Sequence, residues 1–408
     1  MSHQVKVSQE NKIYFKGLNG LRFFAAFLVL MFHAEMIRVK YDLFNLREFT
    51  LFNNGGLAVE FFFVLSGFLI TYLLLAEYRA TNTIKIKHFY MRRILRIWPL
   101  YYLILIIGLL IIPVFVKLLH IDYTSPYPFS GSLLFIFFLP NLALTMYGSS
   151  FLAPLWSIGV EEQFYLFWAP LVKFFKKYLI AIFIIIIGLR VIFYTYVYFK
   201  YTVPSIPETI LVSFINTIKV EVMCIGGIGA WIIFNYKHRL LDLKIFTPGF
   251  QVFFLAMIFI RLVFHKTLIA DNNWISVVYT SLFNSTYSIL ITSTLFLWLI
   301  LNISSNPRTI LSTNNKVLDF LGNISYGIYM YHSIVLFVLM VFLKNFMRQM
   351  SPVVSTVLMY TVAGGVTILV SYLSYRFFEL RFQRLKKGFE PKQESPEEEN
   401  ETKAQVVS

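Results

Sequence analysis

The feature that most limits the fold of this chain is a succession of apolar stretches, each about as long as a bilayer is thick. A hydrocarbon core of about 30 Å is crossed by about 20 residues of helix. Windows of that length fall at 18–38, 57–77, 95–118, 156–172, 178–199, 210–234, 245–264, 278–301, 317–343 and 352–377. The chain is 58% hydrophobic and only 14% charged, unlike a soluble domain. We therefore expect an all-α, polytopic transmembrane bundle of about ten spanning helices.

An eleventh apolar stretch, 130–139, is short and lies between Pro128 and Pro140. Loop 78–94 is rich in Lys and Arg, whereas loop 119–129 has none, which places the first inside and the second outside. If 130–139 crossed the membrane, the lysine cluster at 173–177 would lie outside. We therefore expect ten crossings, both termini in the cytoplasm, and a re-entrant or surface helix within 130–150 on the outer side. Lys344 and Arg348 form the one basic cluster that this topology leaves outside.

The rest of the chain is short. Residues 1–16 form a polar cytoplasmic segment, 17–385 the transmembrane domain, and 386–408 an acidic tail that we expect to be disordered in the cytoplasm. No cleavage site follows the first apolar stretch, so we expect it to be retained. The single cysteine, Cys224, excludes an intrachain disulfide. The net charge of +15 lies mainly in loops beside apolar stretches, which indicates the cytoplasmic face and no nucleic-acid partner.

Ionisable residues at bilayer depth are rare and usually functional. Arg22 and His33 lie in the first apolar stretch, about 20° apart around a helix and about 16 Å apart along it. They form one polar stripe, with Arg22 toward the cytoplasm and His33 in the outer half. Taken singly, each has a structural interpretation, Arg22 as a snorkelling arginine and His33 as a helix-packing residue. Glu35 points away from the stripe, and we expect it at the interface without a role.

The second apolar stretch carries Glu60 near its outer end, at a depth similar to that of His33. A carboxylate there could orient the imidazole, or could be an interfacial residue stabilised by the helix dipole. Ser66 and Gly67 interrupt an aromatic run near the middle of the membrane. This pair is more typical of a close-packing notch than of a nucleophile.

Arg93 and Arg96 share a face at the cytoplasmic end of the third stretch, a pattern suited to binding phosphate. Snorkelling arginines without a ligand also occur at the cytoplasmic ends of membrane helices. Glu161 and Glu162 are adjacent inside a later span. They point about 100° apart, so we expect one to face a cavity while the other pairs with an arginine.

A late span carries Ser325, Tyr329 and His332 at the spacing i, i+4 and i+7, as a polar stripe. Such a stripe is more typical of contacts between helices than of catalysis. We therefore interpret Ser66, Tyr329 and His332 as substrate-binding or structural polar residues. We expect no metal ion.

Five stretches in this order resemble the acyltransferase family 3 of membrane O-acyltransferases. The matching positions are Arg22 and His33, Phe61 to Ile70, Arg93 and Arg96, Trp156 to Tyr165, and Ser325 to His332. The resemblance extends across most of 17–385. Many members add an extracellular esterase-like domain after a further helix, and we expect this chain to be a stand-alone member.

The resemblance implies transfer of an acyl group, usually acetyl from cytoplasmic acetyl-CoA, to a hydroxyl of an extracytoplasmic glycan. The acceptor would be lipopolysaccharide O-antigen, capsule, exopolysaccharide or peptidoglycan, and the location a bacterial inner membrane. The expected partners are acyl-CoA inside, a glycan or lipid-linked glycan outside, and membrane lipids. A secondary transporter or glycan flippase is the alternative from another class, although we see no paired Gly/Pro-interrupted halves.

Within that resemblance, Arg93 and Arg96 would hold the CoA phosphates, and Arg22, also a cofactor-binding residue, would hold phosphate or line the channel. The thioester would then arrive beside His33, which we expect to be catalytic, either as general base and acid or as a transient acyl-histidine. Glu60, Glu161 or Glu162 would orient the His33 ring, and the sequence leaves open which of them does so.

Overall fold

The computed structural model describes residues 15–121, 123, 125–200, 206–270, 274–283 and 287–390, and every regular element in them is helical. The α-helices are α1 (Leu18–Lys40), α2 (Gly55–Thr81), α3 (Ile86–Ile106), α4 (Ile112–Leu118), α5 (Phe129–Ile136), α6 (Pro140–Tyr147), α7 (Leu155–Phe175), α8 (Leu179–Lys200), α9 (Ile206–Thr217), α10 (Val220–Leu241), α11 (Pro248–Val263), α12 (His265–Ala270), α13 (Trp274–Phe283), α14 (Ser288–Ser305), α15 (Lys316–Asn323), α16 (Ser325–Arg348), α17 (Pro352–Ser374) and α18 (Leu380–Leu385). The short turns are η1 (Thr50–Asn53), η2 (Ile107–Ile111), η3 (Lys176–Tyr178), η4 (Lys244–Phe246), η5 (Tyr375–Glu379) and η6 (Lys386–Phe389).

Eight helical segments of the described chain are long and apolar enough to cross a membrane. They are Leu18–Lys40, Gly55–Thr81, Ile86–Leu118, Leu155–Val197, Ile210–Leu241, Ser288–Ser305, Ser325–Arg348 and Pro352–Phe389. The 43-residue segment Leu155–Val197 contains the turn η3, which lies between the two spans predicted at 156–172 and 178–199. The membrane-helix architecture is therefore confirmed, but the expected number of about ten is not.

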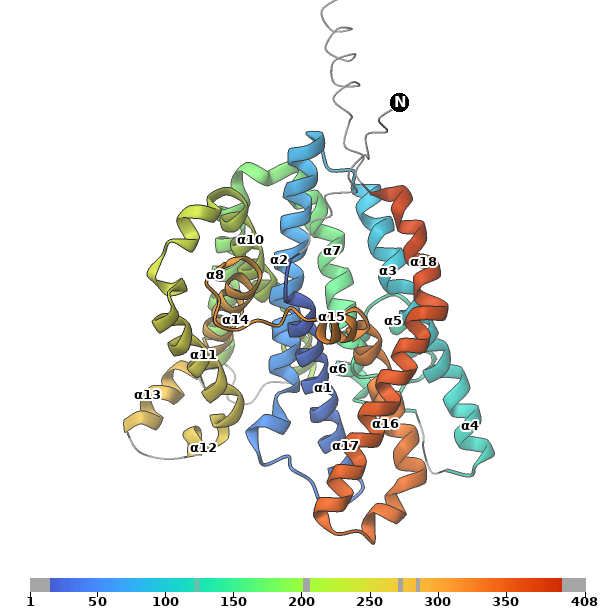
Figure 1. The fold of residues 1–408 in the computed structure, drawn as a ribbon. Helices are drawn as coiled ribbons and strands as arrows, with labels where there is room; N and C mark the ends of the chain where they lie inside the picture. The colour runs from blue at the N-terminus through green and yellow to red at the C-terminus, as the bar shows by residue number, and fades with distance from the viewer. Residues whose placement is uncertain are drawn as a thin grey trace, which may run out of the picture.

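Helix α2 lies in the middle of the bundle and packs against α1, α7 and α10 (Figure 1). Helix α1 begins alongside the middle of α2 and runs toward the end at which α2 starts, so the two are antiparallel (Figure 1). In this arrangement Arg22, in the second turn of α1, and Ser66 of α2 line the same cavity. The arrangement places the sequence motifs of five helices around one interior space.

Two expected spans are broken within the described residues, and a third, 278–301, includes residues 284–286, which lie outside them. The stretch 317–343 is not one helix but α15 followed by α16, and Figure 1 shows α15 end-on while α16 runs downward. The break lies at Ile324, two residues after Gly322, and a side chain on Gly322 would strike the backbone of Asn19. The hydroxyl of Ser325 donates to the carbonyl of Gly322 at the turn, at 2.7 Å. The stretch 210–234 is likewise divided, between α9 and α10.

The region between Pro128 and Gly148 forms two helices of eight residues each, α5 and α6. Neither is long enough to cross a bilayer, since eight residues of helix extend only about 12 Å. The expectation of a short helix within 130–150 that does not span therefore agrees with the structure. Helix α6, which begins at Pro140, was not expected from the sequence.

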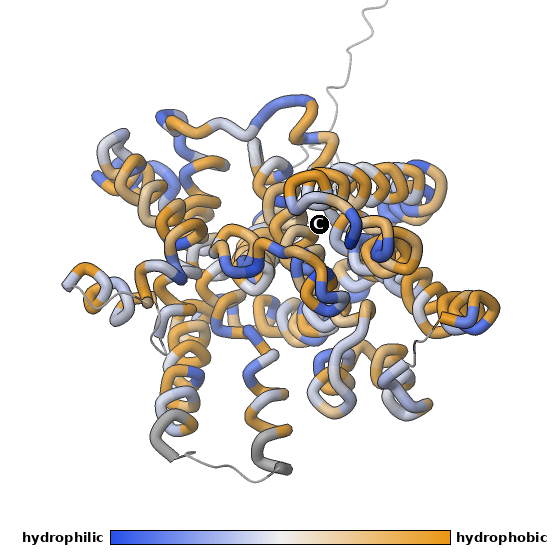
Figure 2. The backbone as a smooth tube through the Cα atoms, turned by 90° about the horizontal axis from the view of Figure 1, so that it is seen from below, coloured by the Kyte–Doolittle hydropathy of each residue, from blue (hydrophilic) through white to orange (hydrophobic). Residues whose placement is uncertain are grey.

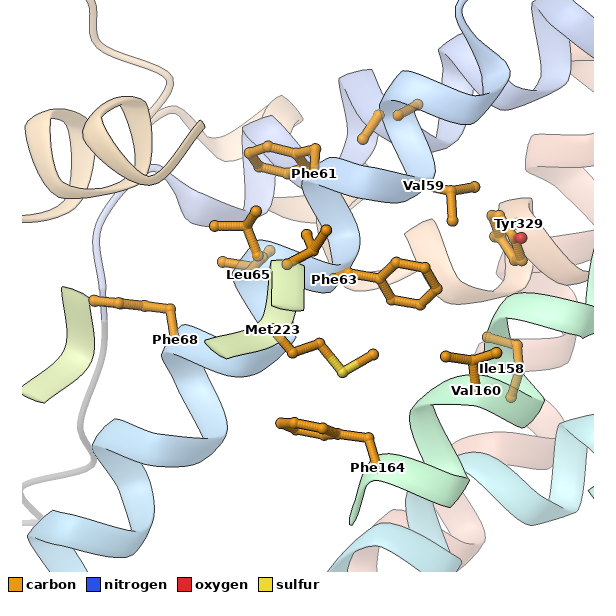
Figure 3. Packing of buried hydrophobic residues seen from close by; sticks show 14 of the residues in the cluster. Val59, Phe61, Phe63, Leu65, Phe68, Ile158, Val160, Phe164, Met223 and Tyr329 are labelled. Atoms are coloured by element: carbon orange, nitrogen blue, oxygen red, sulfur yellow. The ribbon is translucent and has the colours of Figure 1, made fainter. Parts of the chain in front are cut away.

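Glycines allow α2 and α10 to approach backbone to backbone. A methyl group on Gly67 would meet the carbonyl of Met223, and one on Gly226 would meet the carbonyl of Val64. Figure 3 shows Met223 pointing between the aromatic side chains of α2 and α7. The interpretation of Gly67 as a close-packing notch is therefore confirmed.

The molecule exposes large apolar side chains on its outside, as expected for contact with lipid. Examples from different helices are Leu110, Phe167, Ile192, Phe342 and Val357, each at least 60% exposed. Hydrophobic colouring dominates the helical tube in Figure 2.

The end of the described chain is attached to α3. Arg92 donates to the carbonyl of Phe389 at 2.7 Å and forms an ion pair with Glu77 at 2.5 Å. The tail expected from 386 onward therefore overlaps the ordered turn η6. Its residues 391–408, and residues 1–14 of the expected N-terminal segment, lie outside the described residues.

Candidate active site

A cavity of about 120 Å³ lies between α1, α2, α3, α7, the end of α15 and α16. On α2 its walls run from Phe62 to Leu73, which corresponds to about 16 Å along the helix. The polar residues that line it are Arg22, Ser66, Arg93, Arg96, Ser157, Glu161, Tyr165, Asn323, Ser325, Tyr326 and Tyr329. Residues from five separate sequence motifs, including most of the expected site, thus share one space.

Three arginines face this cavity, Arg22 from α1 and Arg93 and Arg96 from α3. In the described part of the chain, none of them donates a hydrogen bond or forms an ion pair within the protein. The buried Nε of Arg93 has no acceptor, and its guanidinium lies 5.8 Å from the ring centre of Tyr165. A half-buried guanidinium group ordinarily finds an acceptor, so this cluster has the character of an anion site.

Carboxylates lie near the arginines without direct contact. Glu161 acts electrostatically on Arg22, Glu162 on Arg93, and Glu379 on Arg96. None of the three carboxyl groups accepts a hydrogen bond from these arginines, so the hydrogen-bonding capacity of the guanidinium groups stays unused within the protein.

Glu161 is held by hydroxyl groups. The hydroxyl of Ser66 donates to one carboxylate oxygen at 2.7 Å, and that of Tyr165 to the other at 3.2 Å. Glu162 points elsewhere and accepts the indole N–H of Trp98 at 2.8 Å. Glu161 thus faces the cavity, as expected for one of the pair. The expected arginine partner of Glu162 is replaced by Trp98, because Arg93 acts on Glu162 only at a distance.

His33 of α1 and His332 of α16 meet at one end of this region. His33 Nδ1 lies 3.2 Å from His332 Nε2 and 2.9 Å from the carbonyl oxygen of Val29. His332 Nδ1 lies 2.5 Å from the carbonyl oxygen of Tyr329, which itself lines the cavity. The two histidines do not line the cavity but lie one helical turn beyond its Tyr329 wall. The Tyr329 hydroxyl shares a hydrogen bond with Ser157 at 2.7 Å.

Glu60 does not contact His33. The charged groups that act on its carboxylate are Lys219 and Glu221 at the start of α10 and Arg261 of α11. Among the described residues, no carboxylate acts on the His33 ring. The expectation that Glu60, Glu161 or Glu162 orients His33 is therefore not met, because the neighbour of His33 is His332.

Glu35 is not interfacial, contrary to the expectation from the sequence. It is fully buried and forms an ion pair with Arg38, also fully buried, at 3.1 Å. It also accepts the hydroxyl of Tyr360 at 2.6 Å and the backbone N–H of Leu46 at 2.5 Å. The physical reason is the loop after α1, which folds back and covers this turn of the helix.

Three residues of this region were not singled out from the sequence. Tyr165 follows Glu161 by four residues, so helical spacing alone places it on the same face. Trp98 and Glu379 carry no comparable signal, because their partners lie on other helices. Within the described residues, no three His, Cys, Asp or Glu side chains gather closely enough to hold a metal ion.

The fold and the site together define an integral-membrane protein whose helices enclose a polar cavity with free cationic groups. Its family follows from sequence comparison: residues 15–376 match the model described as "Acyltransferase domain", so the chain belongs to the acyltransferase 3 family. This membership favours the enzyme over the transporter or flippase that the sequence left as the alternative.

The curated relatives are bacterial. A Staphylococcus aureus protein named "Putative O-acetyltransferase" is 28% identical over 392 residues, which cover 91% of this chain and 58% of that protein. The peptidoglycan O-acetyltransferase OatA of Listeria monocytogenes is 28% identical over 177 residues, 42% of this chain and 26% of OatA. The Bacillus subtilis protein named "Putative peptidoglycan O-acetyltransferase YrhL" is 34% identical over 159 residues, 38% and 23% respectively. The chain thus spans 58% of the length of the first of these relatives. No solved structure matches it.

Proposed function

We propose that this protein is a membrane O-acyltransferase that moves an acyl group, in the first instance acetyl, from cytoplasmic acyl-CoA to a hydroxyl of an envelope glycan. The membership of the acyltransferase family supports the reaction class. The names of two relatives make peptidoglycan the first acceptor to test, ahead of O-antigen, capsule and exopolysaccharide.

The observation that carries the donor assignment is the set of three arginines without hydrogen-bond acceptors around one cavity. Guanidinium groups bind phosphate through forked hydrogen bonds, and the phosphates of CoA would supply the missing acceptors. Arg93 and Arg96 are three residues apart on α3 and therefore present one face to the ligand.

The length of the site matches that of an extended donor arm. The pantetheine arm of CoA is about 15–20 Å long when extended. The cavity follows α2 for about 16 Å, and Arg22 and His33 are about 16 Å apart along α1. A phosphate held by the arginines would therefore place the thioester near the Tyr329 wall, next to His33.

The direction of transfer rests on charge. Arg79, Lys85 and Lys87 surround the turn between α2 and α3, and such clusters mark the cytoplasmic side of membrane proteins. With that turn in the cytoplasm, both termini are cytoplasmic, the arginine end of the cavity faces the donor, and the outer end faces the glycan in a bacterial inner membrane.

His33 is the proposed catalytic base. Its imidazole takes the proton from the acceptor hydroxyl, whose oxygen attacks the thioester carbonyl; the carbon–sulfur bond breaks, and the proton passes to the departing CoA thiolate. In the alternative route, His33 first attacks the thioester and releases CoA, and the acceptor hydroxyl then takes the acyl group from the transient acyl-His33. Incubation with radiolabelled acetyl-CoA without acceptor distinguishes the routes, because only the second leaves label on the protein.

The test uses purified protein with acetyl-CoA and a soluble muropeptide, and measures the release of CoA thiol. His33→Ala and His33→Gln should lose at least about 100-fold in kcat, the usual contribution of a general base. Parent-level acetylation in either variant would refute the assignment. A protein that neither binds acetyl-CoA nor releases thiol would refute the proposed function itself.

The donor site is tested by Arg93→Gln and Arg96→Gln. Each should raise the KM for acetyl-CoA by about tenfold, because a hydrogen bond to a charged group contributes about 1.5–3 kcal/mol. Lys87→Gln is the matched control, since Lys87 lies exposed on the same helix outside the cavity. An unchanged KM in both arginine variants would contradict the donor assignment.

A further inference from the structure

His33 of α1 and His332 of α16 bring two imidazole rings into contact from opposite ends of the sequence. Their ring centres are 4.9 Å apart, and His33 Nδ1 lies 3.2 Å from His332 Nε2. His332 is fully buried, whereas His33 is half-buried. A fully buried histidine that points its Nε2 at a second imidazole has a more specific placement than a packing residue requires.

The backbone assigns the protons of both rings. A carbonyl oxygen only accepts hydrogen bonds, so a ring nitrogen beside one must carry the hydrogen. His33 Nδ1 lies 2.9 Å from the carbonyl of Val29, and His332 Nδ1 lies 2.5 Å from the carbonyl of Tyr329. In the neutral rings, both Nε2 atoms therefore hold the lone pair. His33 Nδ1–H is shared between the Val29 carbonyl and His332 Nε2, and His33 Nε2 is left as the basic atom.

No carboxylate takes the place of His332. Across the described residues, no carboxylate acts on the His33 ring, and the only side chain that acts electrostatically on His332 is His33. When His33 gains a proton at Nε2, its Nδ1–H becomes a charged donor. The acceptors present for it are the Val29 carbonyl and the lone pair of His332, and hydrogen bonds with an ionised partner are about twice as strong as neutral ones.

We propose that His332 is a positioning residue for His33, whose Nε2 accepts the hydrogen of His33 Nδ1 and thereby orients the ring and stabilises its protonated form. This inference rests on the proposed function. During transfer the proton moves from the acceptor hydroxyl to His33 Nε2 and then to the thiolate sulfur, while His332 neither gains nor loses one. His332 follows Tyr329 by three residues, so a single turn of α16 joins the cavity wall to the pair.

The test separates an acceptor from a packing residue by comparing His332→Gln with His332→Leu. The Gln amide oxygen can accept near the position of Nε2, whereas Leu fills the space without an acceptor. In the thiol-release assay, we expect Leu to lower kcat by about 10- to 100-fold with the KM for acetyl-CoA within about twofold, the pattern of an interaction used in the transition state. Gln should retain at least about tenfold more kcat than Leu.

A packing role predicts the reverse order, because Leu suits a buried apolar site better than an amide. Equal kcat in Gln and Leu, or Leu above Gln, therefore overturns the proposal. If thermal melting shows that His332→Gln or His332→Leu does not fold, His332→Glu and His332→Met replace the pair as acceptor and non-acceptor. The proposal then requires a higher kcat for His332→Glu than for His332→Met.

His33→Ala is measured alongside, so that the two levels of inference fail separately. If the His33→Ala variant is active, His33 is not the catalytic base and the proposed mechanism is wrong. If His33→Ala is inactive while His332→Leu keeps the kcat of the parent, only the positioning role of His332 is refuted. If the proposal holds, the double variant His33→Ala/His332→Leu is no slower than His33→Ala, because His332 acts only through His33.

Discussion

The ion pair between Glu35 and Arg38 follows His33 on α1 and has a structural role. His33 faces His332, whereas two residues later Glu35 binds Arg38, the hydroxyl of Tyr360 and the backbone of Leu46. A fully buried carboxylate that accepts three hydrogen bonds from the protein is not accessible to a substrate. Its contacts instead tie α1 to α17 and to the loop that follows α1.

Removing one member of this pair leaves the other charge buried without a partner, at a cost of about 3–5 kcal/mol. Glu35→Met should therefore lower the thermal unfolding midpoint strongly, and the double variant Glu35→Met/Arg38→Met should recover much of the loss. Lys40→Met, at an exposed position of the same helix, is the control. A double variant less stable than Glu35→Met alone would contradict this account of the pair.

Ser66 lies in the cavity with its hydroxyl on Glu161, an arrangement that also suits a nucleophile. We expect it to act only as a hydrogen-bond donor, worth about 0.5–1.5 kcal/mol. Ser66→Ala should therefore keep kcat within about tenfold of the parent in the thiol-release assay. A loss as large as that of His33→Ala would instead make Ser66 an acyl carrier.

The residue types at the site were predictable from the sequence, but their partners were not. Arg22, Arg93 and Arg96 stood out because charge at bilayer depth is costly, and they do share a cavity. Glu60 stood out for the same reason, yet it faces Lys219 and Arg261. Helical spacing fixes the direction of a side chain on its own helix, but only packing decides which helix lies opposite.

At the scale of elements, the contact between α2 and α10 holds one wall of the cavity in place. Gly67 follows Ser66 directly, and no side chain fits between Gly67 and the Met223 carbonyl. The close approach of α10 therefore fixes the rotation of α2 that points Ser66 toward Glu161.

Gly67→Ala should destabilise the protein by about 1–3 kcal/mol, the usual cost of overpacking. Gly188→Ala is the matched control in α8, because a methyl group there meets nothing within 4 Å and replaces a poor helix former. We expect it to leave the melting midpoint unchanged or to raise it. Equal midpoints for the two variants would show that the α2–α10 contact tolerates a larger separation.

The break between α15 and α16 marks the limit of hydropathy as a guide to elements. Residues 317–343 form one apolar window, but Gly322 lies against the backbone of Asn19 and the helix ends there. The apolar windows predict which parts of the chain are membrane helices, because burial in lipid depends on composition. They could not find this corner, because it depends on a contact between residues about 300 positions apart in sequence.

At the scale of the whole molecule, the structure relates the ends of the helices to one another. Arg348 at the end of α16 donates to the carbonyl of Tyr41 at the end of α1, at 3.0 Å, so these two helices end on one face. Lys344 and Arg348, the basic cluster that the topology leaves outside, therefore belong to the face where α1 ends. Which face meets the cytoplasm rests on the positive charges near the turn between α2 and α3.

Cysteine labelling tests this direction, because the only native cysteine, Cys224, is fully buried and gives little background. Arg47→Cys lies after α1 and Lys85→Cys before α3, both at exposed positions. A membrane-impermeant maleimide should label Arg47→Cys in intact cells and Lys85→Cys only in inverted vesicles. The opposite pattern would put Arg93 and Arg96 at the outer surface, where no acyl-CoA is available, and the proposed path of the donor would then be wrong.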